Sequence, residues 1–169
     1  MNLSVVQSKV ANFERSGIQL PSLVSINDLR NVVCALKKKP QGISAVEITD
    51  IFRRRLFEPC KLMAYEAWGI VDYQRNVISL SSLGWQLADF IKSEAEVYRN
   101  VLRNFEPYFA TLGWISQLEI NPVVSGEVIN FWNQNNFSKV NLTEDKAIEN
   151  SVVSFFHLCH AAELGIASV

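Results

Sequence analysis

The sequence is poor in the residue types that build phosphate loops, metal centres and disulfide frameworks, since its 169 residues include 7 Gly, 3 Cys and 2 His. The glycines are scattered and the pattern G-x-x-x-x-G-K-[ST] does not occur, which excludes a P-loop nucleotide site. The cysteines, Cys34, Cys60 and Cys159, lie in apolar helical contexts that are typical of buried thiols in a reducing compartment. We therefore expect a cytoplasmic protein that binds no nucleotide and no other cofactor.

Long hydrophobic runs are also missing. The chain is 49% hydrophobic, which is enough for a substantial core, but charges and prolines interrupt every apolar segment. None approaches the roughly 20 apolar residues that a membrane-spanning helix needs. The N-terminal residues lack the basic start, apolar run and cleavage site of a secretory signal. The sequence thus predicts neither membrane insertion nor secretion.

Charge is nearly balanced overall but is unevenly distributed. The formal net charge is -1. From Arg30 to Arg75, nine Lys and Arg stand against five Asp and Glu, and from Asn76 onward five stand against ten. This asymmetry disfavours nucleic-acid binding along the whole protein and leaves room for a local basic patch in the first half.

The segment 64–91 has the clearest local pattern. Gly69 follows an apolar helical run and suits a left-handed helix end. Two alternating apolar runs, 70–73 and 77–81, flank a short polar segment in which Asn76 tolerates positive φ, which indicates a β-hairpin. Ser82 is a candidate cap of the next helix. The expected inward positions of that helix are Trp85, Ala88 and Ile91.

Three helices are expected before the hairpin. The first would be capped by Ser25 or Asn27. The second would start at Ser44, which forms a capping box with Glu47. The third would open at Pro59, a residue suited to the first helical turn. Three helices followed by a hairpin are typical of a winged-helix domain.

Helical patterns continue after the hairpin. Ser93 and Glu96 form a second capping box, and Pro107 predicts a restart within the apolar face that follows. A short helix is expected near Ser125, and a long helix is expected from Thr143 to a stop at Gly165, with a strand at 166–169.

These elements predict a mainly α-helical protein of two tandem winged-helix-like modules with a small β-hairpin wing. Its expected parts are an N-terminal arm at 1–25, a winged-helix domain at 26–92 and a second, degenerate winged-helix-like module at 93–169. The second module shows the order helix, helix, helix, strand, and its wing is missing or cut short.

Most of the chain resembles the AAA-associated C-terminal domain, which is found behind the ATPase of some nitrate or sulfonate-type ABC transporters. The matching segments are the Gly42 turn leading into Ile48, the junction 67–70, residues 78–80 with 82–88, the aromatic helix 98–107, and residues 160–164. The resemblance implies regulation or partner binding beside an ATPase, with no catalytic residues. The sequence departs from that context because it contains no P-loop of its own.

Basic side chains in the first half form a candidate nucleic-acid site. Arg53, Arg54 and Arg55 are expected in the turn between the second and third helices, where helix-turn-helix proteins contact phosphates. The full candidate set is Lys37, Lys38, Lys39, Arg53, Arg54, Arg55, Lys61 and Arg75. The third helix, however, offers only Lys61, Tyr65 and Glu66 as outward residues, which are poorly suited to reading bases. A solvated basic turn is the more frequent explanation of such a cluster.

Two further sets of residues are candidates for a site. His157 and His160 share a helical face, but Cys159 points elsewhere and no second ligand pair is near, so we expect neither a metal site nor catalysis. The aromatic residues of the second half are more often core, although their density favours an interface with a protein partner or a second copy. The candidate interface residues are Trp114, Trp132, Phe155 and Phe156.

The sequence leaves two hypotheses for function. The first is a non-catalytic regulatory or protein-interaction module, which the acidic second half and the plain third helix favour. The alternative is a DNA-binding transcriptional regulator that uses the basic helix-turn and the wing.

Overall fold

The computed structural model describes residues 20–44, 47–48, 50–118, 122–137 and 145–165. It is mainly helical, with a small three-stranded antiparallel sheet. The described helices are α2 (Ile26–Lys37), α3 (Ile51–Leu56), α4 (Pro59–Ala67), α5 (Ser82–Ala88), α6 (Glu94–Asn104), α7 (Glu106–Ile115), α8 (Ser125–Gln134) and α9 (Asp145–Ala161). The strands are β1 (Ile43–Ser44), β2 (Val71–Gln74) and β3 (Val77–Leu80).

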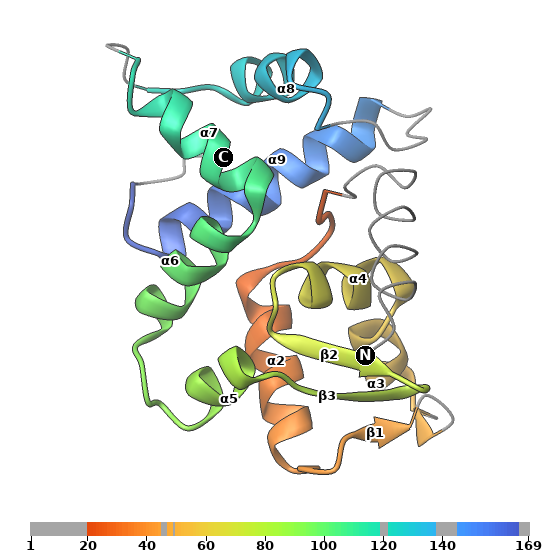
Figure 1. Ribbon diagram of the computed structural model, residues 1–169. Coiled ribbons are helices and arrows are strands. Elements are labelled where there is room, and N and C mark those ends of the chain that lie inside the picture. Colours follow the sequence, from red (N-terminus) through yellow and green to blue (C-terminus); the bar gives the residue numbers. More distant parts are fainter. Residues whose placement is uncertain (1–19, 45–46, 49, 119–121, 138–144, 166–169) are drawn as a thin grey trace, which may run out of the picture.

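Two regions can be followed in Figure 1. Helices α2 to α5 and the sheet form the lower region, called the front part here, which covers residues 20–91. Helices α6 to α9 form the upper region, the back part, which covers residues 92–165. Helix α9 packs on both α6 and α8 and also reaches α2, so it joins the two parts.

Helix α2 begins with the predicted capping box. The Ser25 hydroxyl accepts a hydrogen bond from the Asp28 backbone N–H at 3.1 Å, and the Asp28 carboxylate accepts one from the Ser25 N–H at 3.0 Å. Two backbone N–H groups that have no partner within the helix are thereby satisfied at its start. The periodic apolar residues Leu29, Val32, Val33 and Leu36 are all buried.

The predicted helix start at Ser44 is wrong. Ile43 and Ser44 form β1, in which Ile43 pairs with Ile78 of β3 and is 1% exposed. The Ser44 N–H does donate to the Glu47 carboxylate at 3.1 Å, so one half of the capping box forms without starting a helix there. The helix α3 begins only at Ile51. A two-residue strand has no local signal of its own, because its burial depends on a partner far away in the sequence.

The hairpin forms as predicted, with strands β2 and β3 joined by Arg75 and Asn76. Both turn residues have positive φ, 52° and 63°, as a two-residue type I′ turn requires. Gly69, at φ 68°, ends α4, and the following Ile70 N–H donates to Tyr65 O at 3.0 Å. Because β3 lies between β1 and β2, the sheet order is β1-β3-β2.

Ser81, rather than the predicted Ser82, caps α5 and fixes it to the end of α4. Its hydroxyl accepts from the Gly84 N–H at 3.0 Å and donates to the Gly69 carbonyl. Gly84 packs so closely that a Cβ there would collide with the Ile70 carbonyl oxygen. The helix stops at Ala88, and the predicted inward residue Ile91 is instead 68% exposed in the turn that follows.

The back part follows the predicted boundaries more closely. The Ser93–Glu96 capping box starts α6, and the chain restarts as α7 with Pro107 in its first turn. The N-cap of α8 is Val124, one residue before the predicted Ser125. Helix α9 ends at Ala161, and Glu163 then adopts the left-handed backbone conformation, at φ 59°. The predicted helix stop was Gly165, two residues further along the chain. The predicted Thr143 start and the strand at 166–169 lie outside the described residues.

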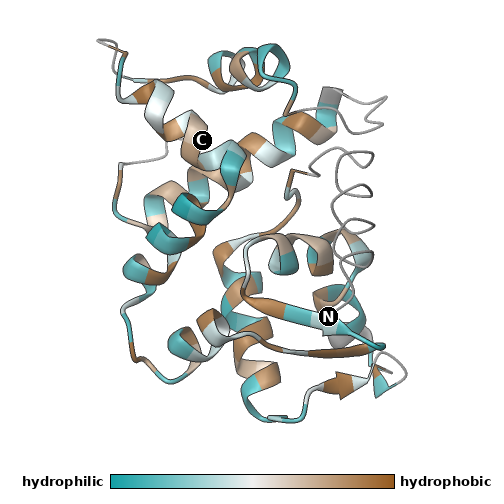
Figure 2. Cartoon of the chain, viewed as in Figure 1, coloured by the Kyte–Doolittle hydropathy of each residue, from teal (hydrophilic) through white to brown (hydrophobic). Residues whose placement is uncertain are grey.

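One hydrophobic core runs through both parts. The buried residues from Leu20 to Ala162 form a single cluster, so the predicted boundary at 92/93 does not separate two cores. Trp68, at the end of α4, and Tyr108, on α7, are both buried at the junction. Burial raises the pKa of Tyr108, and the neighbouring Trp68 indole acts in the opposite direction. Figure 2 shows hydrophobic and hydrophilic residues alternating along the helices, as is expected of helices that turn one face toward a shared core.

The fit of α5 against Ile70 predicts the result of adding one methyl group. Gly84→Ala should lower the free energy of unfolding by about 1–3 kcal/mol, because the new Cβ displaces backbone. Gly113→Ala is the matched control, since nothing lies within 4 Å of a Cβ there, and it should stabilise the helix by up to about 1 kcal/mol. Urea unfolding of both variants measures the difference, and equal stabilities would contradict the close packing.

Candidate functional site

The three arginines do not lie in a turn, as predicted, because residues 53–55 belong to α3. Arg54 and Arg55 are exposed, and the Arg53 side chain lies outside the described residues. The predicted turn between helices is shorter, because α3 runs on to Leu56 and α4 begins at Pro59.

Two of the predicted contact lysines already have partners. The Lys61 ammonium pairs with the Asp28 carboxylate at 3.1 Å, and both side chains are largely shielded, at 17% and 24% exposure. The Lys37 ammonium donates to the Ala88 carbonyl at 2.7 Å and pairs with Asp89 at 3.1 Å, so it holds the end of α5. These two cations stabilise the fold and are poorly placed to bind phosphate.

The outer face of α4 has no side chain that reads bases. Tyr65, predicted to point outward, is fully buried and donates its hydroxyl to Leu56 O at 3.2 Å. The exposed positions are Glu58, Pro59, Met63, Glu66 and Ala67. Burial, and then the nearby Asp72, raise the pKa of Glu66. This face therefore presents apolar and acidic groups, neither of which suits a DNA groove.

Lys38, Lys39 and Arg75 are exposed, as Arg54 and Arg55 are. They come from three places: the loop after α2, helix α3 and the tip of the hairpin. The exposed cations of the predicted basic set therefore lie on three separate elements.

Two of the predicted interface aromatics are core residues. Trp132 and Phe155 have no exposed surface, and their rings pack edge to face with centroids 6.0 Å apart. The Trp132 indole N–H donates to the buried Thr111 hydroxyl at 2.6 Å, which satisfies its polar atom inside the core. The interface prediction is therefore wrong for these two residues, because their helix faces turn inward.

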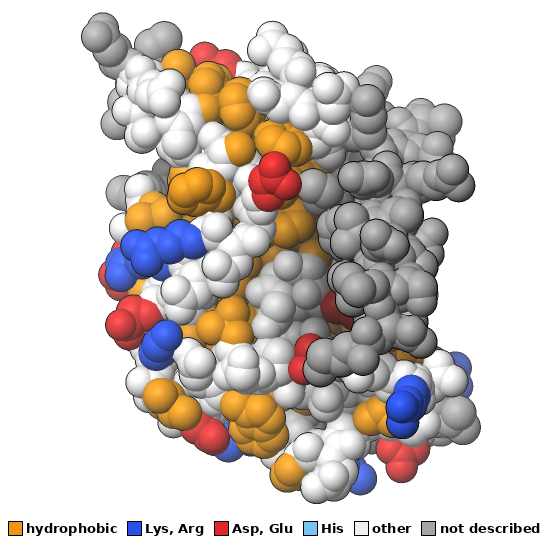
Figure 3. Space-filling model, viewed as in Figure 1, with side chains coloured by type: hydrophobic (Ala, Val, Ile, Leu, Met, Phe, Trp, Pro, Cys, Tyr) orange, Lys and Arg blue, Asp and Glu red, His pale blue; other side chains and the backbone are white. Residues whose placement is uncertain are grey.

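Helix α7 is almost entirely apolar, and most of it is at least partly buried, but Phe109 and Gly113 are exposed. After Glu106 it contains no charged residue. Phe109 is 60% exposed, and the half-buried Trp114 stacks on Phe131 of α8 with ring centroids 4.7 Å apart. Figure 3 shows hydrophobic side chains at the surface along the line between α7 and α8. The buried residues of α7 are Pro107, Tyr108 and Thr111.

Phe156, the remaining predicted interface residue, is half-buried on α9 beside Phe155, at 5.7 Å between centroids. It does not belong to α7. Phe109 was not among the predicted interface residues. The unbroken apolar sequence of its helix could have indicated that an apolar side chain would be left exposed there.

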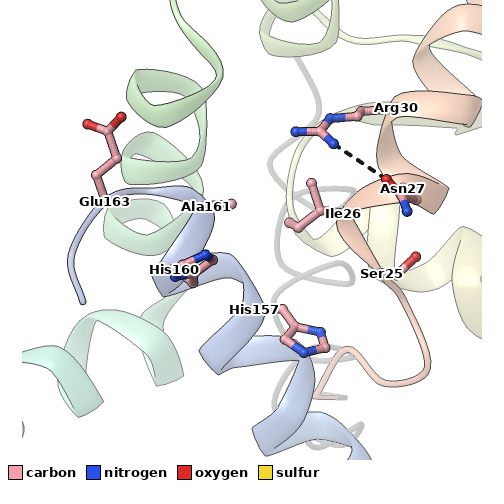
Figure 4. A pocket seen from close by; sticks show the side chains of 8 residues that line it. All are labelled: Ser25, Ile26, Asn27, Arg30, His157, His160, Ala161 and Glu163. Atoms are coloured by element: carbon pink, nitrogen blue, oxygen red, sulfur yellow. Dashed lines mark hydrogen bonds between the residues drawn. The ribbon is translucent and has the colours of Figure 1, made fainter. Parts of the chain in front are cut away.

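A cavity of about 530 Å³ lies between the first turn of α2 and the last turns of α9 (Figure 4). The predicted shared face of His157 and His160 lines it, and Cys159 does not. Burial raises the pKa of Cys159 to about 12, so this thiol is a poor nucleophile at neutral pH. Among the described residues, no group of three or more His, Cys, Asp and Glu could hold a metal ion.

Comparisons with protein-family models, with curated proteins and with solved structures give no match. In the described part of the chain, no helix has both the length and the apolar character needed to cross a membrane.

The shielded Lys61–Asp28 pair predicts a pH-dependent contribution to stability. Burial would raise the pKa of Asp28, but hydrogen bonds from Ser25 and the Lys61 charge outweigh it and lower the pKa. The stabilisation is therefore present above the unfolded value of 3.8 and is lost as the pH falls through the lower folded value.

Asp28→Asn should lower the free energy of unfolding by about 1–2 kcal/mol at neutral pH, and the difference should narrow at about pH 3. Asp89→Asn is the matched control, because its pair with Lys37 is about half exposed and should contribute less than about 0.5 kcal/mol. Urea unfolding at the two pH values measures both, and a loss that is independent of pH would contradict this role of the charge.

Proposed function

We propose that this protein is a non-catalytic protein-interaction module that binds its partner through the exposed face of α7. One observation carries the proposal: α7 contains no charged residue after Glu106, and within the described structure the large apolar side chain of Phe109 is left 60% exposed on it. An apolar helix face in contact with water is costly, and such faces commonly mark protein interfaces. The aromatic pair Trp114 and Phe131 at its edge is of the type enriched at the centre of interfaces.

The front part supports a winged-helix assignment within this proposal. From α2 to β3 the order is helix, strand, helix, helix, strand, strand, and the sheet order is β1-β3-β2. This order fits a winged helix whose wing is the β2–β3 hairpin. The resemblance to the AAA-associated C-terminal domain adds a regulatory role beside an ATPase, in which the front part would serve as scaffold and α7 as the contact.

A photo-crosslinking amino acid at Phe109 tests the interface. Cross-linking in an extract of the source cells should give one dominant product, and mass spectrometry then identifies it as another protein or a second copy. Phe90 is the matched control, because it is an aromatic residue that is 83% exposed but lies outside α7.

Competition makes the result specific. Excess unlabelled protein should abolish the Phe109 product, and the Phe109→Ser variant should compete at least tenfold more weakly, as is expected for an interface hot spot of about 1.4 kcal/mol or more. Identical products from positions 109 and 90, or equal competition by Phe109→Ser, would refute the α7 interface.

DNA binding is the second candidate function, and the exposed Arg54 and Arg55 on α3, with Arg75 at the wing tip, favour it. Backbone contacts by these groups would bind duplex DNA without sequence preference, since the outer face of α4 lacks base-reading residues.

Fluorescence anisotropy with a labelled duplex at several salt concentrations tests this candidate. If all three arginines bind phosphates, replacing them with Ala should reduce the slope of log affinity against log salt by about 0.9 for each arginine replaced. Arg103→Ala on α6 is a matched control that removes an exposed cation from the back part. An unchanged slope and affinity in the triple variant would exclude the candidate.

A further inference from the structure

We propose that the cavity between α2 and α9 binds a small organic carboxylate, independently of the α7 interface. The front part supplies the beginning of α2 and the back part supplies the end of α9, so the site exists only where the two parts pack together. Its volume of about 530 Å³ falls within the range of small-molecule sites. The lining residues are Ser25, Ile26, Asn27, Arg30, His157, His160, Ala161 and Glu163.

Arg30, Asn27 and His157 are the lining residues that keep hydrogen-bond donors for a ligand. Arg30 uses Nε and Nη2 on Glu94, at 2.9 and 2.7 Å, and its Nη1 makes only a 3.4 Å contact with the side-chain oxygen Oδ1 of Asn27. Because the Asn27 side-chain oxygen faces Arg30, the side-chain nitrogen Nδ2 of Asn27 is directed to other acceptors. His157 has no hydrogen-bond partner within the described residues, whereas His160 places Nδ1 3.2 Å from Gly165 O and so donates there, which leaves its Nε2 as an acceptor in the neutral ring.

The acidic groups near the cavity are already occupied. Glu94 is held by Arg30, and this guanidinium lowers its pKa, so it remains a charged acceptor committed to that pair. Glu163 accepts from Arg99 at 3.1 Å and points away from the two imidazoles in Figure 4. The cavity thus offers the Asn27 amide, the Arg30 guanidinium and the His157 imidazole to a ligand oxygen, and the one carboxylate in its lining, Glu163, is paired with Arg99.

The balance of charge favours one carboxylate over a phosphate. Arg30 is neutralised by Glu94, so the cavity has no strong excess of positive charge to hold a doubly charged group. The apolar side chains of Ile26 and Ala161 lie beside the polar groups and suit a short hydrocarbon chain. A ligand with a carboxylate and a small apolar part would therefore contact both α2 and α9.

The chain has only two histidines, and both line the cavity, so imidazole NMR signals report on this site directly. Titration with butyrate should shift both signals along a saturable curve, with a Kd of about millimolar order for so small a ligand. Binding should also raise the melting temperature, because the ligand is held by the folded protein alone. Butyramide, the uncharged analogue, and inorganic phosphate should shift the signals at least tenfold more weakly.

Two substitutions separate a binding role of His157 from a structural one. His157→Leu should weaken butyrate about tenfold, which is the loss of one hydrogen bond to a charged group, and His157→Gln, which keeps a donor, should weaken it less. Lys38→Ala, an exposed cation that does not line the cavity, should leave the affinity unchanged. Linear, unsaturated shifts, equal shifts with butyramide, or equal affinity in His157→Leu would overturn the proposal.

Discussion

The structure depends on one shared hydrophobic core, because the two parts of the chain would each be left with an uncovered apolar face if separated. Trp68 from the front part and Tyr108 from the back part meet within this core. The Ser154 hydroxyl of α9 lies 3.4 Å from the Val24 carbonyl at the start of α2, so the same junction also carries a polar contact across 130 residues. Direct contacts between α2 and α9 place these helices side by side, and the cavity lies between them.

Electrostatics act mainly within this framework. Arg30 joins α2 to α6 through Glu94, Lys37 holds the end of α5, and Arg99 holds the end of α9 through Ala162 O at 2.9 Å. Of the predicted basic set, Lys37 is thus used to hold a helix end, and Lys61 is paired with Asp28. The protein-interaction proposal gains from this, since fewer cations remain for phosphate while Phe109 of α7 remains exposed.

The helices and hairpin were predictable where their signals are local. Capping at Ser25 and Ser93, the left-handed Gly69 and the Pro107 restart each depend on residues within a few positions of one another. The strand β1 was not predictable, since Ile43 is buried only through its pairing with Ile78. The candidate sites were predicted less well for the same reason: whether Trp132 or Phe109 faces water depends on which helix lies opposite.

The sequence by itself determined the mainly helical character, the hairpin and most helix boundaries, because backbone hydrogen bonding and capping are satisfied by near neighbours. It also determined that the phosphate-binding P-loop is missing. Only the tertiary structure decided that Lys61 is paired, that Trp132 and Phe155 are core, and that two histidines meet the start of α2. Burial and charge pairing are properties of contacts between distant segments, and a linear pattern does not specify which segments those are.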